Sequence, residues 1–255
     1  MKKIAILTGA TGGLGKEFVK CLLNENIDEI WAVARNKEKL DQLCSQYGTM
    51  IFSVQCDLSK ESELSSLSAL INQQKPDIRF LINNAGIAKM GRYDEFTDME
   101  ISQSIDTNCK AAVLLCRYSL PYMKKGARII NISSASSFQP TPYINLYAAG
   151  KVFLRSYSRS LNCELKSRGI TSTAVCPGWI DTELLPKKAN GRKIHYPGMV
   201  KAEAVAKKAM YDSEKGRDMS VCSLYVKYEH LFSKIMPQKL VMKIWTTGIK
   251  KYIKN

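Results

Sequence analysis

The segment that decides the fold is Lys3-Ile4-Ala5-Ile6-Leu7-Thr8-Gly9-Ala10-Thr11-Gly12-Gly13-Leu14-Gly15. Its first residues are mostly apolar and predict a buried strand, and a helical pattern of apolar residues follows the glycines. Glycines let the backbone turn tightly and approach a pyrophosphate, whose negative charge is stabilised by the free amides at the helix N-terminus. A strand, a glycine-rich turn and a helix in this order predict a dinucleotide-binding site.

Further strands alternate with helical segments along the rest of the chain. Helical patterns separate the strands, and one of them, from Glu100 to Lys124, contains the weak helix former Asn108. This alternation predicts an α/β fold, a doubly wound, Rossmann-like parallel sheet of about seven strands with helices on both faces. No linker divides the 255 residues, so we expect a single domain over 1–255. Besides the first strand, we expect strands at 30–34, 50–56, 79–82, 127–132, 171–176 and 219–224.

Cysteine and histidine usage limits the possible chemistry and location. The eight cysteines are scattered without a C-x-x-C pair, which predicts reduced thiols and a cytoplasmic protein. The N-terminal apolar run is too short for a signal peptide, and no stretch reaches the ~18 apolar residues of a membrane span, so membrane contact would be peripheral. His195 and His230 lack clustered cysteine or carboxylate partners, so we expect no metal site and no Ser-His-Asp hydrolase.

The net charge of +15 is concentrated near the C-terminus. From Lys187 onward there are 16 Lys and Arg against 5 Asp and Glu, whereas the chain before Lys187 has 22 against 18. Such basicity raises the possibility of a nucleic-acid or anionic-membrane partner. No zinc-finger, helix-turn-helix or RNA-recognition motif accompanies it, so we expect no nucleic acid.

The end of the second strand indicates which dinucleotide is bound. Dinucleotide folds place the residue that meets the adenosine ribose at about this position, which holds Arg35-Asn36 and no acidic residue. A carboxylate there would repel a 2′-phosphate, whereas the guanidinium of Arg35 is suited to bind one. The sequence therefore favours NADP(H) over NAD(H). Alternatively, Arg35 caps or solvates the helix expected over 37–47.

Polar and small residues follow several other strands. Asp57-Leu58 comes after the third strand, Asn83-Asn84-Ala85-Gly86 after the fourth, and a cluster of hydroxyl side chains at 133–137 after the fifth. Open parallel sheets bind ligands at the carboxyl ends of their strands. These residues are therefore candidates for the ligand site.

Tyr147 and Lys151 are four residues apart in a predicted helix, so the phenol and the ammonium lie on the same face. A nearby positive charge favours the phenolate and so brings the tyrosine toward the range where it exchanges protons at neutral pH. This pair could serve as an acid and base. The same spacing also occurs in ordinary surface pairs, so its meaning depends on the rest of the chain.

The motifs together resemble one family, the short-chain dehydrogenases/reductases, from the N-terminus to just past Thr182. The family's T-G-x-x-x-G-x-G corresponds to Thr8–Gly15, its N-N-A-G to Asn83–Gly86, its Y-x-x-x-K to Tyr147 and Lys151, and its P-G-x-x-x-T to 177–182. The resemblance implies that the catalytic residues are Asn108, Ser134, Tyr147 and Lys151. It implies cofactor contacts at Gly9, Thr11, Gly13, Leu14, Gly15, Arg35, Asn36, Asp57, Leu58, Asn84, Ala85, Gly86, Tyr147, Lys151, Pro177, Gly178, Ile180 and Thr182.

The resemblance also implies a reaction, the transfer of a hydride between NADP(H) and a carbonyl carbon. Tyr147 exchanges the proton with the substrate oxygen, and Ser134, which precedes Tyr147 at the family's spacing, binds the same oxygen. Lys151 is expected to lower the pKa of Tyr147 and to bind the nicotinamide ribose, and Asn108 to hold a water that links Lys151 to solvent. Ser133 is an adjacent alternative to Ser134. The other function we consider is a membrane-associated or regulatory NADP(H)-binding protein with little turnover.

The expected substrate segments are rich in large apolar side chains. They comprise 88–93, 136–145 and a lid at about 179–199, and they suit a hydrophobic ketone or secondary alcohol, such as a hydroxysteroid or a 3-oxoacyl lipid. Several of these side chains could instead pack the lid against the sheet, and the lid lysines and arginines could meet an anionic substrate tail or only solvent. The apolar residues are Met90, Phe138, Tyr143, Trp179, Leu184, Leu185, Tyr196 and Met199, and the basic ones are Lys187, Lys188, Arg192 and Lys193.

A basic C-terminal extension occupies about 225–255 and is the part least typical of the family. Past Pro237, one helical face holds Val241, Ile244, Trp245, Ile249 and Tyr252, and lysines occupy another. Such a helix could contact an anionic membrane, but we favour packing on its own domain, closure over the substrate or a subunit contact. The family usually forms homodimers or homotetramers through the helices that hold Asn108 and Tyr147.

Overall fold

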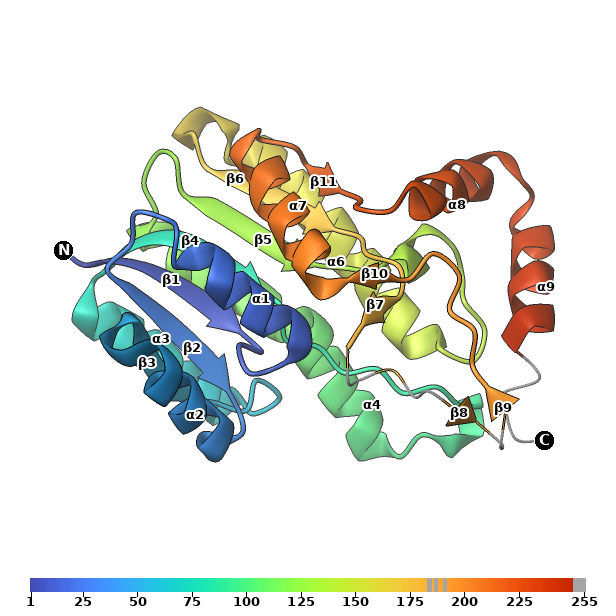
Figure 1. The fold of residues 1–255 in the computed structure, drawn as a ribbon, viewed down its shortest axis with the longest axis horizontal. Helices are drawn as coiled ribbons and strands as arrows, with labels where there is room; N and C mark the ends of the chain where they lie inside the picture. Colours follow the sequence, from blue (N-terminus) through green and yellow to red (C-terminus); the bar gives the residue numbers. More distant parts are fainter. Residues whose placement is uncertain (183–184, 186–187, 190–191, 250–255) are drawn as a thin grey trace.

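A seven-stranded, fully parallel sheet forms the centre of the protein (Figure 1). The computed structural model describes residues 1–182, 185, 188–189 and 192–249, with the backbone alone at 188–189 and 192–193. The strand order is β11-β6-β5-β4-β1-β2-β3, which confirms the predicted doubly wound α/β fold. The strands are β1 (Lys3–Thr8), β2 (Glu29–Ala34), β3 (Ile51–Gln55), β4 (Asp77–Asn83), β5 (Arg128–Ile132), β6 (Thr171–Val175) and β11 (Met219–Ser220).

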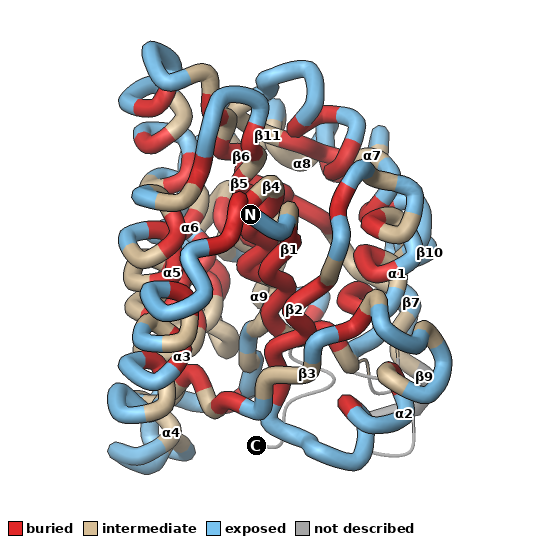
Figure 2. Tube along the Cα trace, turned by 90° about the vertical axis from the view of Figure 1, so that its left-hand side faces the viewer, coloured by how far each residue is buried: buried red, intermediate tan, exposed pale blue. Residues whose placement is uncertain are grey.

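Helices cover both faces of the sheet (Figure 2). One layer contains α1, α2 and α7, and the opposite layer contains α3, α5 and α6. The strand predicted at 219–224 is only two residues long, and helix α8 begins at Leu224, the last residue of the predicted range. The helices are α1 (Gly13–Leu22), α2 (Lys37–Tyr47), α3 (Glu61–Gln74), α4 (Asp98–Ile105), α5 (Ala111–Ser119), α6 (Asn145–Glu164), α7 (Ala202–Glu214), α8 (Leu224–Ile235) and α9 (Gln238–Ile249).

Strand β1 lies in the middle of the sheet and contributes to both hydrophobic layers. Ala5 and Leu7 pack with α1 and α7, whereas Ile4 and Ile6 pack with α3 and α5. All four residues are fully buried, as expected for a parallel strand with helices on both sides. Burial of a side chain as large as Ile or Leu stabilises the fold by about 1.5–3 kcal/mol. The uninterrupted apolar run thereby fixes β1 at the centre and its carboxyl end beside the glycine turn.

The helix expected over 100–124 is interrupted at Asn108. Helix α4 ends at Ile105, a π-helical turn spans Asp106–Lys110, and α5 begins at Ala111. A π turn adds a residue to the helical turn and is found frequently at functional sites. The interruption places Asn108, which is 1% exposed, in the interior.

The expected lid contains two small pairs of strands. β7 (Ile180–Asp181) pairs in parallel with β10 (Val200–Lys201), and β8 (Lys188–Ala189) pairs antiparallel with β9 (Arg192–Lys193). Leu184 and Lys187 lie outside the described residues. The pairing of β7 with β10 therefore brings the two ends of the lid side by side, outside the central sheet.

The C-terminal extension forms two helices, α8 and α9, which lie beyond the carboxyl end of the sheet at the right of Figure 1. On α9, Val241 and Ile249 are buried, and the indole of Trp245 donates a hydrogen bond to the carbonyl oxygen of Pro142. The part of this face that holds Val241, Trp245 and Ile249 therefore packs on its own domain, one of the arrangements favoured from the sequence. Ile244, which was expected on the same face, is 54% exposed, and Tyr252 lies outside the described residues. Within the part of the chain that the structure describes, none of the helices combines the length and apolarity needed to cross a bilayer.

Candidate active site

The glycine turn after β1 adopts a conformation that requires glycine at two positions. Gly9 has a φ of +64°, and its amide donates a hydrogen bond of 2.8 Å to the carbonyl oxygen of Val33 on β2. A Cβ on Gly15 would collide with the carbonyl oxygen of Gly9, so this glycine allows α1 to lie close to the turn. The turn is held at the carboxyl end of the sheet, as predicted.

Thr8 joins the glycine turn to the segment after β4. Its hydroxyl oxygen accepts hydrogen bonds of 3.0 Å from the amides of Asn84 and Ala85. In return, the side-chain amide of Asn84 donates to the carbonyl oxygens of Thr8 (3.0 Å) and Gly9 (3.1 Å). The Asn84 side chain therefore stabilises the glycine turn through hydrogen bonds to its backbone, a role that the motif alone did not indicate.

The N-terminus of α1 has free donors for an anion. Its N-cap is Gly12, no side chain caps it, and the first turn has no acidic residue. Amides left free at a helix N-terminus attract a phosphate, particularly where no carboxylate competes. Thr182 lies beside this turn, because a Cβ on Gly13 would be 2.8 Å from its methyl carbon. The side chains of Leu14, Leu58 and Pro177 are buried, so their contacts with a ligand would come from the backbone.

Arg35 lies exposed at the end of β2, close enough to Asp57 for its charge to contribute to the lowered pKa of that carboxyl group. Burial acts to raise the pKa of Asp57, but the hydrogen bonds from Ser59 together with the charges of Arg35 and Lys60 lower it below its usual range. Asn36 is the residue that caps α2, because its Oδ1 accepts a 2.7 Å hydrogen bond from the amide of Lys39. Among the described residues, the Arg35 side chain has no hydrogen bond or ion pair, so it is not the cap.

Lys151 extends from α6 into the interior and is 2% exposed. Its ammonium donates a 2.7 Å hydrogen bond to the carbonyl oxygen of Ile132 and lies 5.4 Å from the centre of the Tyr147 ring. Burial disfavours the charged amine and lowers its pKa to about 8. A Cβ on Gly86 would lie 3.2 Å from Lys151 Nζ and 3.0 Å from Asn108 Oδ1, so the two polar groups border the same space.

The phenol of Tyr147 lies beside Ser134. Burial raises the pKa of Tyr147, and a hydrogen bond with the Ser134 side chain works in the opposite direction. The expectation that Tyr147 has a lowered pKa is therefore wrong for this structure. The physical reason is that burial outweighs the hydrogen bond, while the ammonium of Lys151 is bound to Ile132 rather than to the phenol oxygen.

The two adjacent serines after β5 have different environments. Ser133 is 1% exposed, and its hydroxyl donates a 2.7 Å hydrogen bond to the carbonyl oxygen of Lys151. Ser134 is only partly buried, and its Oγ accepts a 3.1 Å hydrogen bond from the amide of Ser136. This difference favours Ser134 as the residue available to a substrate, in agreement with the spacing.

Asn108 links the π turn to the segment after β4. Its Oδ1 accepts a hydrogen bond from the amide of Ile87 (3.0 Å), and its Nδ2 donates to the carbonyl oxygen of the same residue (2.9 Å) and to Ser104 (3.2 Å). The side-chain amide of Asn108 thus satisfies both the N–H and the C=O of Ile87, as the backbone of a neighbouring strand would. This pairing holds Asn108 beside Gly86 and Lys151.

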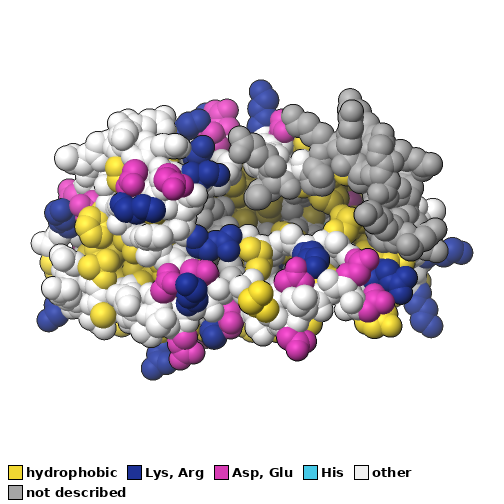
Figure 3. All heavy atoms as spheres, turned by 90° about the horizontal axis from the view of Figure 1, so that it is seen from below, with side chains coloured by type: hydrophobic (Ala, Val, Ile, Leu, Met, Phe, Trp, Pro, Cys, Tyr) yellow, Lys and Arg dark blue, Asp and Glu magenta, His cyan; other side chains and the backbone are white. Residues whose placement is uncertain are grey.

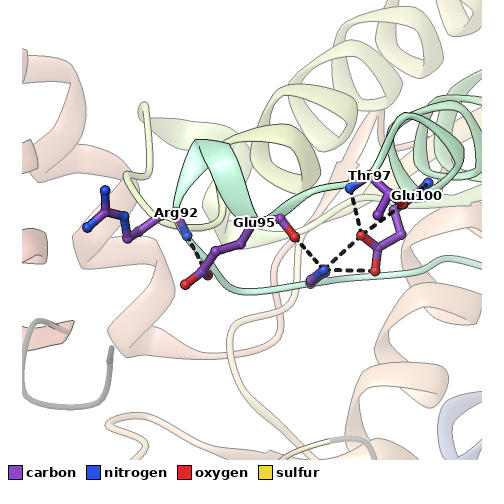
Figure 4. A network of polar contacts seen from close by, with 5 residues as sticks. Arg92, Glu95, Thr97 and Glu100 are labelled. Atoms are coloured by element: carbon purple, nitrogen blue, oxygen red, sulfur yellow. Dashed lines mark hydrogen bonds and ion pairs between the residues drawn. The ribbon is translucent and has the colours of Figure 1, made fainter. Parts of the chain in front are cut away.

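A polar network fixes the expected substrate segment at 88–93 against the start of α4 (Figure 4). Lys89 Nζ donates hydrogen bonds of 2.8 Å to the carbonyl oxygen of Glu95 and to the carboxylate of Glu100. The Glu100 carboxylate also accepts from the amide of Thr97, whose hydroxyl caps α4, and the Glu95 carboxylate accepts from the amide of Arg92. The network orders the loop between β4 and α4.

Aromatic side chains from the lid and from α9 meet in one cluster. The ring of Trp179 lies 4.9 Å from Tyr196 and 6.4 Å from Trp245, centre to centre. Trp245 belongs to α9 and was not assigned to the site from the sequence, although its place on an apolar helical face indicated burial. Figure 3 shows hydrophobic side chains inside a hollow to the right of the centre of the lower face.

No group of three or more His, Cys, Asp or Glu side chains within the described part of the chain could hold a metal ion. Three groups that support the site were not predicted from the sequence: the hydroxyl of Thr8, the carbonyl oxygen of Ile132 and the indole of Trp245. The Ile132 group is a backbone carbonyl, which every residue has, and threonine is common in strands. Neither group therefore leaves a signal in the sequence.

Comparison with known proteins identifies similar chains. Residues 3–193 match the family described as short chain dehydrogenase. An uncharacterized oxidoreductase of Staphylococcus epidermidis is 28% identical over 185 residues, which cover 72% of this chain and 80% of that protein. The very-long-chain 3-oxoacyl-CoA reductase of Anas platyrhynchos is 32% identical over 197 residues, which cover 71% of this chain and 60% of the reductase.

Solved structures agree on the fold. A short-chain dehydrogenase from Sphingobium yanoikuyae in complex with NADPH has a TM-score of 0.77 and 24% identity to this chain, with 95% of this chain and 96% of that one covered. The likeness extends past residue 193 and so includes the part of the chain that follows the family match.

Proposed function

Because the chain belongs to the short-chain dehydrogenase family of oxidoreductases, we propose that it interconverts a hydrophobic ketone and the corresponding secondary alcohol with NADP(H). The observation that carries the proposal is the convergence of four side chains around Gly86 and α6. Asn108 and Lys151 border the space beside Gly86, Lys151 lies 5.4 Å from the Tyr147 ring centre, and the Ser134 side chain is close enough to Tyr147 to act on the pKa of its phenol.

Tyr147 is proposed as the acid and base of the reaction. In reduction, its phenol donates a proton to the substrate carbonyl oxygen while Ser134 donates a hydrogen bond to the same oxygen, and oxidation reverses both steps. Because burial raises the pKa of Tyr147, the phenol is protonated at neutral pH, which is the form that reduction requires. Bound NADP(H) supplies or accepts the hydride at C4 of its nicotinamide.

Lys151 and Asn108 are proposed to resupply the proton. With a pKa of about 8, the Lys151 amine can release and accept protons near neutral pH. Asn108 Oδ1 borders the same space as Lys151 Nζ, where it can hold a water that leads to solvent. We also assign Lys151 to the nicotinamide ribose, so that one side chain orients both the cofactor and the acid.

Several features of the described residues fit NADP(H). The uncapped first turn of α1 offers amide donors to the pyrophosphate, and the conformation of Gly9 brings the backbone close to it. Arg35 is exposed at the end of β2, and its side chain makes no hydrogen bond or ion pair with the described residues, so its guanidinium is available to a 2′-phosphate. We also assign Asn36 to this phosphate, although its Oδ1 already accepts the hydrogen bond that caps α2.

The proposed substrate is a bulky apolar ketone or alcohol, with hydroxysteroids and 3-oxoacyl lipids as the leading classes. Trp179, Tyr196 and Trp245 form an aromatic cluster that suits such a molecule. The relative from Anas platyrhynchos is named as a reductase of very-long-chain 3-oxoacyl-CoA, which supports the second class, although the chain spans 60% of that protein.

The proposed assembly is a homodimer or homotetramer that pairs through the helices holding Asn108 and Tyr147, which are α4 and α5 with the π turn between them, and α6. Ile105, Val152 and Phe153 are large apolar residues exposed on or beside these helices, and contact with a second subunit would bury them.

The proposed location is the cytoplasm. All eight cysteines are unpaired, which suits a reducing compartment. The apolar face of α9 has no part in membrane contact in this proposal, because Val241, Trp245 and Ile249 face the domain.

A screen of NADPH oxidation with steroid ketones and 3-oxoacyl thioesters tests the proposal. We expect turnover by the wild type and a loss of about 10²- to 10⁴-fold in Tyr147→Phe, which lacks the proton, with NADPH still bound. Wild-type turnover in Tyr147→Phe would rule out this assignment. Tight NADPH binding without turnover of any carbonyl would instead favour a regulatory NADP(H)-binding protein.

A further inference from the structure

Helix α8 has an apolar stripe on the face that points away from the domain. Leu224, Tyr228, Leu231 and Ile235 are 80%, 66%, 56% and 70% exposed. Their spacing of four, three and four residues places all of them on one side of the helix. Figure 1 shows α8 at the edge of the molecule, beyond the sheet. Four large apolar side chains in one exposed row indicate an interaction surface, because single exposed residues are usual but rows are not.

The opposite face of α8 is the one that packs on the domain. Val226 is 1% exposed, and a Cβ on Gly178 would lie 2.7 Å from its methyl group. The ring of His230 lies 4.0 Å from that of Phe138, centre to centre. The orientation of α8 is therefore fixed by its inner face, whereas more than half of the surface of each residue in the outer stripe is exposed.

The charges beside the stripe are positive. Lys227 and Lys234 are exposed and follow the same edge of the stripe, one helical turn from Leu231 on either side. Lys239 and Lys243 are exposed on α9, the next helix. The single acidic residue of 224–249 is Glu229, which is partly buried, and burial raises the pKa of its carboxyl group. An apolar row edged by lysines matches the acyl chains and phosphates of an anionic lipid surface.

We propose that the outer face of α8 docks on an anionic membrane surface. The apolar stripe enters the boundary between headgroups and acyl chains, and Lys227 and Lys234 lie at the level of the phosphates. A second copy of the chain is a poorer occupant, because pairing two α8 faces would bring two lysine rows together on proteins of net charge +15. The surface differs from the face of α9 that the amphipathic pattern indicated, which is packed on the domain.

Docking through α8 would bring the membrane close to the proposed active site. The inner face of α8 contacts Phe138, which lies at the end of the 3₁₀ turn Ala135–Phe138 that directly follows Ser134. A hydrophobic ketone dissolved in the membrane would then reach the aromatic cluster over a short path. This consequence rests on the proposed function, whereas the docking itself does not.

Co-sedimentation of the full chain with vesicles tests the docking. We expect the wild type to pellet with vesicles of phosphatidylglycerol and phosphatidylcholine, and to bind vesicles of phosphatidylcholine alone at least about tenfold more weakly, because each lysine gains from anionic lipid. Leu231→Ser with Ile235→Ser should weaken pelleting by about tenfold or more, and Lys227→Gln with Lys234→Gln should remove most of the preference for anionic lipid.

The matched control is Met99→Ser with Tyr211→Ser, which removes apolar residues that are 68% and 49% exposed elsewhere. This control should pellet as the wild type does, and all variants should keep the wild-type midpoint of thermal unfolding and NADPH affinity. Equal pelleting of the Leu231 and Ile235 variant and the wild type, or no pelleting at all, overturns the proposal. A smaller sedimenting mass of that variant without vesicles, and no vesicle binding by the wild type, would assign the face to a second copy instead.

Discussion

The ammonium of Lys151 is held by the carbonyl oxygen of Ile132 at 2.7 Å, in an interior where the lysine side chain is 2% exposed. Ile132 is the last residue of β5, so the end of this strand positions the amine that borders Asn108 and Tyr147. One hydrogen bond to a neutral carbonyl does not replace the solvation of a charged amine, and the pKa of Lys151 is accordingly lowered to about 8.

The lowered pKa predicts a pH-dependent stability. In the unfolded chain Lys151 titrates near 10.5 and in the folded chain near 8, so between these values the unfolded state binds more protons. The contribution of Lys151 to the free energy of unfolding should therefore rise from pH 8 to 10.5, by at most ~3 kcal/mol, and be lowest below pH 8. Urea unfolding between pH 7 and about pH 9.5 should show this rise in the wild type but not in Lys151→Met. Parallel pH profiles for the two proteins would contradict it.

Substitution of Ser134 should lower mainly kcat, whereas substitution of Ser133 should lower mainly the free energy of unfolding. Ser134→Ala removes the proposed hydrogen bond to the substrate oxygen, so we expect kcat to fall by about 10²–10³-fold with little change in stability. Ser133→Ala removes the hydrogen bond that the buried hydroxyl donates to the carbonyl oxygen of Lys151, and we expect a destabilisation of about 0.5–1.5 kcal/mol with a smaller loss of kcat. Steady-state kinetics and urea unfolding of both variants give the comparison. The opposite order of effects would transfer the catalytic role to Ser133.

Arg35→Asp should reverse the preference between NADPH and NADH. The change removes a charge-assisted contact with the 2′-phosphate and introduces a carboxylate that repels it, so NADPH affinity should fall by about 10- to 100-fold or more. Asn36→Ala is the control, because it removes the cap of α2 and should cost about 1 kcal/mol of stability without reversing the preference. The ratio of kcat/KM for the two cofactors is the measurement. An unchanged ratio in Arg35→Asp would contradict the assignment of Arg35.

The sheet and the first part of the site were predictable because their signals are local. The apolar run of β1 and the glycines that follow it specify a strand and a tight turn within the single segment from Lys3 to Gly15, and no distant contact is needed to recognise them. Tyr147 and Lys151 likewise owe their common face to the helical period alone. For these residues, both the secondary structure and the nearest neighbours agree with the predictions from the sequence.

The features that were not predicted depend on distant contacts or on burial. The π turn at Asn108 is supported by hydrogen bonds to Ile87, a residue on another segment, so the local pattern predicted a continuous helix. The pKa of Tyr147 was expected to fall because the lysine is four residues away, but its direction is set by how deeply the phenol is buried, which spacing does not reveal. Trp245 and Pro142, which its indole hydrogen-bonds, are 103 residues apart in the sequence, so no local pattern indicates their contact.

Trp245 should control access to the proposed substrate site. Its indole bonds Pro142 and stacks with Trp179 at an interplanar angle of 16°, so it connects α9 to both the loop before α6 and the start of the lid. Trp245→Phe keeps an aromatic ring but loses the hydrogen bond, and Trp245→Ala loses both. We expect KM for bulky ketones to rise in the order wild type, Trp245→Phe, Trp245→Ala, by up to about tenfold, with the affinity for NADPH unchanged.

Limited proteolysis gives an independent measurement of the same connection. Release of α9 in Trp245→Ala should accelerate cleavage between α8 and α9, because locally opened segments are cut in proportion to their open population. Ile244→Ala is the matched control, since this neighbour on the same helix is 54% exposed and makes no stacking contact with Trp179. Equal cleavage and equal KM in Trp245→Ala and Ile244→Ala would show that α9 is held by Val241 and Ile249 alone, and that Trp245 does not shape the substrate site.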